Sequence, residues 1–443
     1  MAIQLSDHFT YRKLLKFSLP TIGMMIFSCI YGVVDGFFIS NFAGDLPFKA
    51  INLVFPYLMI VATIGFMFGT GGTAIVASTY GAGDKERANR YFSLFVYVAA
   101  VLGVIFGAVS FILMPKIAYL LGARGEILNH AILYARIQMV SLPFLVLQYI
   151  FQSFCVAAEK PKLGFWVIVA AGVTNMVLDA VLVLLLPQQY KLAGASIASA
   201  AAQVLGGGIP LAYFSRKNPT FLRLGKTKFD LRIIGKACAN GSSEFMSNVA
   251  MNLVGMLYNW QLLKYAGEDG VAAYGVMMYV SFIFAAVFLG YSIGVAPVIS
   301  FHNGAANHAE KKSLLKKSLV LVGLTSLIML AIAELLAWPL SRIFVSNPPL
   351  LNMTVHGLRI FSLSFPFMGF AIFASSFFTA LNDGLTSAII SFLRTLVFQL
   401  GAVLLLPLVW KEDGIWFSVV VAEFIAVLFS VVFLIAKKKK YQY

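Results

Sequence analysis

Twelve runs of about twenty apolar residues are the feature that most constrains how this chain folds. A run of this length crosses the roughly 30 Å hydrocarbon core of a bilayer as one helix, because a helix satisfies its own backbone hydrogen bonds. Only 12% of the 443 residues are charged, against about 25% in a soluble domain. The sequence therefore predicts an all-α polytopic membrane protein with twelve transmembrane helices, at roughly 14–40, 51–78, 92–114, 131–157, 164–186, 192–214, 237–263, 271–299, 318–338, 354–380, 386–409 and 415–436.

Lysine and arginine residues are distributed unequally between the two sets of connections. Those on the side of the N-terminus hold 23 of them, and those on the other side hold 7. Because cytoplasmic connections carry the excess, we expect both termini in the cytoplasm and the chain in the inner (plasma) membrane of a bacterium or archaeon. The net charge of +15 lies in these connections, next to the lipid bilayer, so no nucleic-acid partner is expected.

A local pattern returns after 223 residues. Residues 134–154 and 357–377 are identical at seven of 21 positions without a gap. Each half contains six spans, an even number, so both halves enter the membrane in the same sense and form a parallel repeat about an axis along the membrane normal. We predict two six-helix bundles, residues 1–214 and 237–443, joined by a basic cytoplasmic linker at 215–236.

The first span carries one proline and one carboxylate. Asp35 lies about five residues before the outer end of the span, and Pro20 stands fifteen residues earlier. A carboxylate inside hydrocarbon costs several kcal/mol unless it is compensated, and it therefore indicates a functional site. The alternative is an aspartate at the membrane surface that reaches water. Pro20 removes one helical hydrogen bond, which makes it a candidate hinge.

The fifth and sixth spans place more oxygen-bearing side chains at a similar depth. Asn175 and Asp179 are four residues apart, so they share one helix face, and Ser199 follows on the next span. Together with Asp35 they suit either a hard cation such as Na+ or two carboxylates that hold one proton. The alternative is a set of separate interhelical hydrogen bonds. If coupling uses sodium, we expect Asp35, Asn175 and Asp179 to bind Na+.

Other charges inside the spans are less informative. Glu244 is a candidate second coupling or substrate carboxylate, and an interfacial side chain that reaches the membrane surface is an equal alternative. Arg136 and Arg359 are related by the repeat, and we expect a structural role for both. Arg394 and Glu423 are expected to form a structural pair.

These features together resemble the multidrug and toxic compound extrusion (MATE) family, in particular its prokaryotic DinF-like and MepA-like branches. The resemblance rests on two parallel six-helix halves, Pro20 before Asp35, the Asn175-x-x-x-Asp179 pair, and the loops YGAGD and NGAAN after the second and eighth spans. It covers nearly the whole chain. A hydroxyl in the sixth helix also belongs to the site of relatives, and Ser199 stands there where threonine is common.

The resemblance implies a secondary antiporter with a V-shaped central cavity that exports lipophilic, often cationic compounds in exchange for Na+ or H+. Asp35, Asn175 and Asp179 would then carry the coupling ion, and neither a resident cofactor nor a stable oligomer is expected. In the NorM-like branch the coupling carboxylates lie in the C-terminal half. Glu244 resembles one of them, but the tenth span provides no acidic partner.

Two other functions fit the sequence less well than antiport. A lipid or oligosaccharide flippase of the same superfamily usually needs basic residues in its cavity, and none belongs to the layer around Asp35. A membrane-embedded enzyme or a channel is disfavoured because the sequence contains no HExxH motif and no filter-like repeat. The sequence leaves open which compound is carried and whether Na+ or H+ drives transport.

Overall fold

The computed structural model describes residues 3–345 and 347–443, and the regular elements in these ranges are all helical. The α-helices are α1 (Tyr11–Phe38), α2 (Asp45–Gly81), α3 (Lys85–Leu120), α4 (Gly125–Ala157), α5 (Pro161–Leu185), α6 (Lys191–Ser215), α7 (Leu231–Gly304), α8 (His308–Phe344), α9 (Pro348–Ser362), α10 (Phe365–Ala380), α11 (Gly384–Phe392), α12 (Gln399–Leu405) and α13 (Pro407–Tyr441). Short turns complete the set: the π-helical turns η1 (Ile39–Ala43) and η3 (Leu393–Phe398), and the 3-10 turn η2 (Gln188–Tyr190).

The helices of the described ranges account for twelve membrane crossings. Ten helical stretches are each long and apolar enough to cross a bilayer. One of them, α7, has 74 residues and leaves the helical conformation at Gly267, where φ is 66°, so it supplies two crossings. Helices α9 and α10 form a further crossing that is bent by 49°. The prediction of an all-α protein with twelve spans is confirmed.

The tenth span differs from the single helix expected over 354–380. It is broken between Ser362 and Phe365, and α10 restarts with Pro366 in its first turn. A proline has no N–H group, so it cannot continue a preceding helix but is well suited to begin one. Its repeat counterpart Pro143 lies inside the continuous α4, which is why the break did not follow from the sequence.

The segment that joins the two halves is shorter than the linker expected over 215–236. Helix α7 begins at Leu231, so the last six residues of that range are helical. The carboxylate of Asp230 caps the helix, because it accepts the backbone N–H groups of Arg232 and Ile233 at 3.0 and 3.2 Å.

The repeat of 223 residues is visible in the backbone. Three pairs of positions at this offset adopt positive φ, which L-residues rarely do. Each pair ends or interrupts corresponding helices of the two halves. The pairs are Gly44 (108°) with Gly267 (66°), Gly83 (93°) with Ala306 (52°), and Glu159 (61°) with Asn382 (60°).

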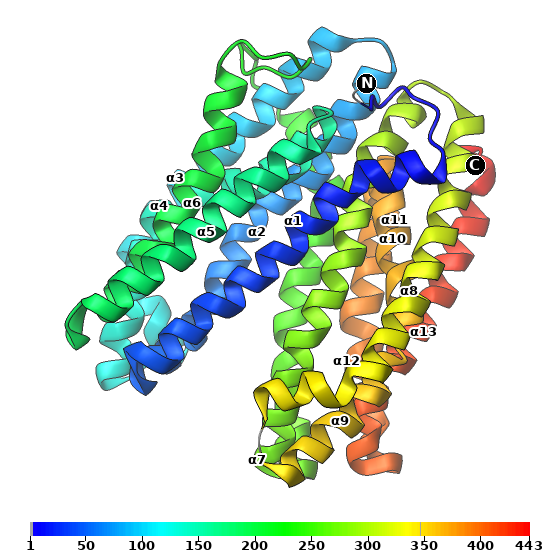
Figure 1. Cartoon of the computed structure of the whole chain (residues 1–443). Coiled ribbons are helices and arrows are strands. Elements are labelled where there is room, and N and C mark those ends of the chain that lie inside the picture. Colours follow the sequence, from blue (N-terminus) through cyan, green and yellow to red (C-terminus); the bar gives the residue numbers. More distant parts are fainter. Residues whose placement is uncertain (1–2, 346) are drawn as a thin grey trace.

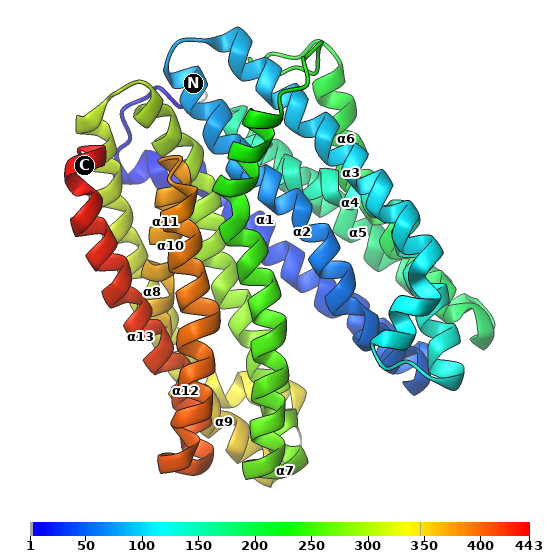
Figure 2. The ribbon, with the colours of Figure 1, turned by 180° about the vertical axis from the view of Figure 1, so that it is seen from behind.

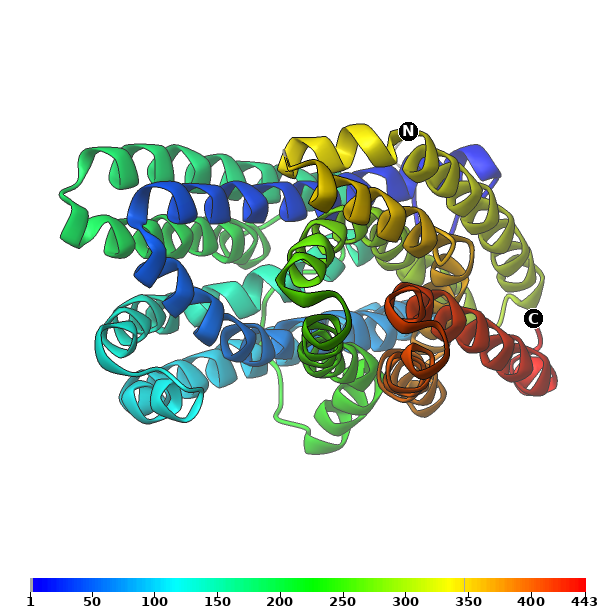
Figure 3. The same ribbon diagram turned by 90° about the horizontal axis from the view of Figure 1, so that it is seen from below.

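The helices form two bundles, each around its own apolar core. One core consists of residues between Ile39 and Ala237, and the other draws mainly on residues between Val254 and Tyr443. Both termini lie at the end where the bundles meet (Figure 1), and the ribbons diverge toward the opposite end in both side views (Figures 1 and 2). Seen from below, the bundles stand side by side (Figure 3).

Helix α1 connects the two bundles. Its first residues, including Leu14 and Phe17, belong to the core of the C-terminal bundle. From there α1 runs diagonally toward α5 of the N-terminal bundle (Figure 1). The two ends of this helix therefore pack against different bundles.

Glycines allow the bundles to touch at the end that carries the termini, which we call the closed seam. A Cβ atom on Gly71 would collide with the Ala237 carbonyl, and one on Gly241 would collide with the Met67 carbonyl. Backbones approach this closely only where side chains are absent. Farther along the seam, Asn382 Nδ2 donates to Ser78 Oγ at 3.0 Å.

Candidate functional site

Asp35 lies in the last turns of α1, directly before the π-helical turn η1. The backbone N–H of Ile39 is shared between the carbonyls of Asp35 and Gly36. Turns of this type are frequent at functional sites. The carboxylate of Asp35 is half-buried and points toward α5 and α6, where its polar neighbours lie.

The structure brings together all four side chains of the predicted coupling site. Ser199 of α6 bridges the other two helices: its Oγ atom lies 3.5 Å from Asp35 Oδ1 and 3.4 Å from Asn175 Nδ2. Asp179 stands one turn after Asn175 on α5, and its carboxyl group is an electrostatic neighbour of Asp35. The site therefore contains two carboxyl groups, an amide and a hydroxyl from three helices.

Asp179 is the buried end of this site. Its side chain is 0% exposed, and neither carboxylate oxygen accepts a hydrogen bond from a described residue. The Oδ1 atom of Asn175 is also buried without a donor. Buried acceptors without donors are costly, and two adjacent carboxylates repel each other. The arrangement is stable when a proton or a small cation lies between these oxygens, and the donor set of hard oxygens fits either ligand.

A polar network that the sequence did not reveal continues from the site between α4 and α6. Gln203, one turn after Ser199, donates to Gln138 Oε1 at 2.7 Å and accepts from Ser141 Oγ at 2.6 Å. Gln138 in turn donates to Ser196 at 3.2 Å. Two glutamines inside apolar runs could have indicated this network, because a buried amide needs hydrogen-bond partners.

A protein-family model named MatE matches residues 20–181 and 245–403, which is well over half of the chain and includes three of the four site residues. The chain belongs to the MatE family. The resemblance to MATE transporters that the motifs indicated is thereby confirmed, and a MatE-family chain is a transporter rather than an enzyme.

Relatives of this MatE-family chain extend over nearly its full length. The protein named "Multidrug export protein MepA" of Staphylococcus haemolyticus is 24% identical over 93% of this chain and 90% of its own length. The protein of the same name from Staphylococcus aureus strain NCTC 8325 is 22% identical over 94% of this chain and 92% of its own.

Solved MatE-family structures share the fold. One is described as the "Outward-facing conformation of a multidrug resistance MATE family transporter of the MOP superfamily"; it superposes with a TM-score of 0.93 at 20% identity, over 100% of this chain and 98% of that one. A Pyrococcus furiosus transporter of the same superfamily superposes with a TM-score of 0.90, also at 20% identity, over 98% of both chains.

Glu244 lies apart from the predicted coupling site of this MatE-family chain. It stands on the first half of α7, and its charged neighbour is Arg394 of η3. Arg394 pairs with the fully buried Glu423 of α13, to whose two carboxylate oxygens its Nε donates at 3.0 and 2.8 Å. The expected pair of Arg394 and Glu423 is therefore present, while a coupling role of Glu244 remains a prediction.

Pro20 lies in the part of α1 that packs against α7 of the C-terminal bundle. Helix α1 is continuous through it. On the C-terminal side of the seam, Gly290 and Gly294 of α7 admit the backbone of Ile22 and the side chain of Ser18. The proline thus stands inside the segment anchored on α7, fifteen residues before Asp35.

Proposed function

We propose that this chain is a secondary antiporter that exports lipophilic, often cationic compounds in exchange for Na+ or H+. The observation that carries the proposal is the pair Asp35 and Asp179 within membrane-spanning helices. Asp179 is fully buried and receives no hydrogen bond from the described residues, and Asp35 is its acidic neighbour. Such a pair needs a proton or cation, and ionisable groups inside a membrane mark ion pathways. The names of the staphylococcal relatives support multidrug export.

Coupling follows from the different ion affinities of two conformations. When one Na+ or H+ binds, it compensates one of the two negative charges of the pair and relieves their repulsion, and the conformation with the intact site is stabilised. When the ion leaves, the repulsion between Asp35 and Asp179 returns and a cationic compound can compete for the charge. A ligand shifts such an equilibrium only through different affinities for the two states.

The moving parts in this proposal are the two halves at 1–214 and 237–443, which rock about the linker at 215–236. Helix α1 couples ion binding to the movement of the bundles, because its first turns pack on one bundle while Asp35 belongs to the other. Pro20 leaves the Lys16 carbonyl without its helical donor, so bending there costs less than elsewhere in α1.

We further propose that the protein acts as a monomer in the plasma membrane, with both termini and the closed seam in the cytoplasm. The excess of basic residues on that side supports this orientation. A cysteine substituted for Lys226 in a background without native cysteines tests it: an impermeant maleimide should label this residue only after the cells are opened. Labelling in intact cells contradicts the orientation.

The deciding experiment measures uptake of a fluorescent lipophilic cation into inverted vesicles. A sodium gradient and a pH gradient are imposed separately, and vesicles with Asp179→Asn serve as the control. We expect one gradient to drive uptake and the variant to show none. Uptake that needs neither gradient, or that persists in the variant, contradicts antiport through this site.

A further inference from the structure

Arg136 on α4 donates to a carbonyl group of α3 that lacks its own helical partner. Its Nε atom lies 3.2 Å from the Phe111 carbonyl oxygen, and its guanidinium carbon lies 5.1 Å from the centre of the Phe111 ring. This carbonyl is free because the residue four positions later is Pro115, which has no N–H group. The two Nη groups of Arg136 make no hydrogen bond or ion pair with a described residue.

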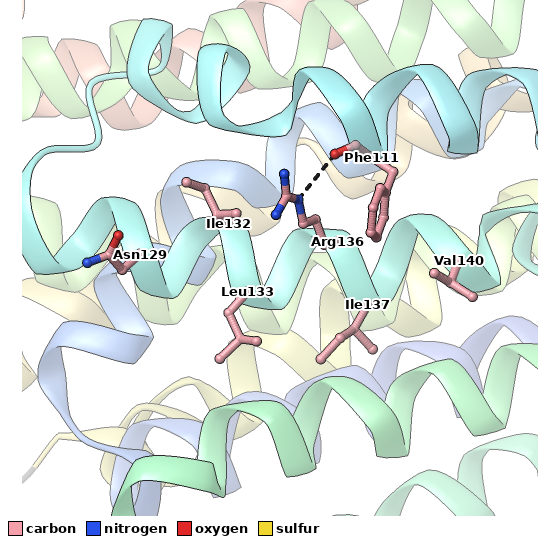
Figure 4. Close-up of a pocket in the computed structure, with 7 residues that line it drawn as sticks. All are labelled: Phe111, Asn129, Ile132, Leu133, Arg136, Ile137 and Val140. Carbon is pink, nitrogen blue, oxygen red and sulfur yellow. Dashed lines mark hydrogen bonds between the residues drawn. The ribbon is translucent and has the colours of Figure 1, made fainter.

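The surface around Arg136 is a strip of α4 that is not covered by other helices. Glycines of three helices mark the covered faces: Gly69 of α2 lies against Tyr149 and Ile150, Gly107 of α3 against Met139, and Gly207 of α6 against Phe144. Between α3 and α6 a hollow of about 310 Å³ remains (Figure 4). We call the surface that lines this hollow the Arg136 strip. It consists of Phe111, Asn129, Ile132, Leu133, Arg136, Ile137 and Val140.

The Arg136 strip faces the bilayer. Helix α2, on the opposite side of α4, makes the contact with α7 of the other bundle, so the strip points away from the protein centre. Val140 is 69% exposed and Leu133 is 40% exposed, while Ile132 and Ile137 are half-buried. Figure 4 shows the guanidinium of Arg136 turned toward α3, above these apolar side chains.

In the second half of the protein, the position that corresponds to Phe111 carries an acidic residue. At the offset of 223 residues, Arg136 corresponds to Arg359 and Phe111 corresponds to Glu334. Arg359 Nε lies 3.9 Å from Glu334 Oε2, so the C-terminal half provides this arginine with a carboxylate. The N-terminal half has a phenylalanine instead, and no described acidic residue forms an ion pair with Arg136.

We propose that the Arg136 strip binds one anionic phospholipid from the leaflet opposite the termini. The phosphate is the counter-ion that Arg136 lacks, and an acyl chain lies in the apolar part of the strip. The guanidinium matches a phosphate because its planar donors bind two oxygens at once. The hollow of about 310 Å³ is at the lower end of the range for ligand pockets, about 300–1,000 Å³.

The height of Arg136 in the membrane agrees with this ligand. It lies eleven residues into α4, which is about 16 Å along the helix. A helix of 33 residues is about 50 Å long, so roughly 10 Å extend beyond each side of a 30 Å hydrocarbon core. The side chain therefore starts about 6 Å inside the hydrocarbon and can extend to the headgroups. A free anion would leave the apolar strip uncovered.

Native mass spectrometry of the purified full-length protein tests the proposal. Palmitoyl-oleoyl phosphatidylglycerol and the corresponding phosphatidylcholine are titrated separately, and the affinity for the first bound lipid is compared. We expect wild type to prefer phosphatidylglycerol by about tenfold or more, because the choline ammonium of phosphatidylcholine places a positive charge beside the phosphate and is repelled by Arg136. Arg136→Gln should remove this preference. Phe111→Glu should do the same, because it gives Arg136 the carboxylate that Glu334 gives Arg359.

Arg359→Gln is the matched control and should keep the preference. Equal affinity of wild type for the two lipids, or an unchanged preference in Arg136→Gln, overturns the proposal. A measurement on wild type alone avoids any effect of the substitutions on folding. Phosphatidylglycerol with a photoreactive acyl chain should label residues 129–140, and inorganic phosphate should not compete. Labelling confined to other segments also overturns the proposal.

Discussion

The Nδ1 atom of His8 lies 2.6 Å from Oε2 of Glu310, a residue 302 positions later in the chain. The other oxygen of Glu310 accepts the backbone N–H of Phe9 at 2.9 Å. Three residues before His8, the N–H of Leu5 donates to Glu159 at 2.8 Å. Glu310 belongs to α8 of the C-terminal bundle, whereas Glu159 follows α4 of the N-terminal bundle. Residues 3–10 therefore tie the two bundles together at the closed seam.

We expect the closed seam to open more often in the Glu310→Ala variant than in wild type. The substitution removes two hydrogen bonds to a carboxylate that is almost fully buried, and each such bond contributes about 1.5–3 kcal/mol. Ser78→Cys in the seam, introduced into a cysteine-free background, provides the readout through its rate of reaction with maleimide. The rate should rise about tenfold or more.

His308→Ala is the control for this experiment, because His308 is exposed at the start of the same helix. It should leave the rate of Ser78→Cys labelling unchanged. If Ser78→Cys reacts at equal rates with and without Glu310→Ala, the contacts of residues 3–10 do not hold the seam closed.

We expect Asp35→Asn and Asp179→Asn each to abolish coupled efflux. Each removes one of the two charges whose neutralisation gives the ion its preference between conformations. Ser199→Ala should reduce efflux less, because water can replace a hydroxyl at 3.4–3.5 Å. Drug efflux from cells with equal amounts of membrane-inserted protein is the measurement. Full resistance with Asp35→Asn contradicts the site and directs attention to Glu244.

Pro20→Ala should leave the fold intact and slow transport. Alanine restores the donor to the Lys16 carbonyl and stiffens α1 between its anchored start and Asp35. Thermal stability of the purified protein should be equal to or above that of wild type, while the turnover number of efflux falls. Unchanged turnover at equal expression would assign Pro20 to packing alone.

Gly241→Ala should destabilise the state with the closed seam. The added methyl group collides with the Met67 carbonyl, and overpacking of this kind typically costs about 1–3 kcal/mol. Gly235→Ala on the same helix is the control, because nothing lies within 4 Å of its Cβ position. Distances between spin labels across the seam should lengthen in Gly241→Ala only. The same distance distribution in both variants contradicts the role of the glycine contacts.

The C-terminal end of α13 should detach at low pH. Tyr441 donates to Asp383 at 2.8 Å, and Lys437 lies 3.5 Å away. Burial raises the pKa of the Asp383 carboxyl, but hydrogen bonds from Tyr441 and Thr386 and the charge of Lys437 outweigh it, so the pKa lies below its ordinary value of 3.8. The stabilisation is therefore fully present above pH 3.8 and is lost as the pH falls through the lowered value.

Hydrogen exchange of residues 434–443, corrected for the intrinsic pH dependence, checks this expectation. Asp383→Asn should raise exchange at neutral pH while it keeps the cap of α11, since asparagine also caps helices. Asp84→Asn, which changes a helix cap at the same end of the molecule, should have no effect on this segment. Protection that is independent of both pH and Asp383 would show that the apolar contacts of Tyr443 suffice.

Much of this architecture follows from the sequence because a bilayer allows few solutions. The spans, the repeat and the side chains around Asp35 depend on hydrophobic length and on the cost of buried charge, both of which are local properties. The break before Phe365 was not predictable, because Pro143 at the repeat-related position leaves α4 intact. The contact of Glu310 with His8 joins distant, polar residues for which the sequence contains no periodic signal.

The packing of α1 determines the order in which parts of the protein can fold during synthesis. Leu5, Phe9, Leu14 and Phe17 are buried in a core whose other members lie mainly between Val254 and Tyr443. Ribosomes add about 5–20 residues per second, so these side chains wait about ten to fifty seconds for their partners. A nascent chain that contains only the first six spans therefore has a completed ion site and an unattached beginning. The start of α1 therefore finds its packing partner only after α7 has been synthesised.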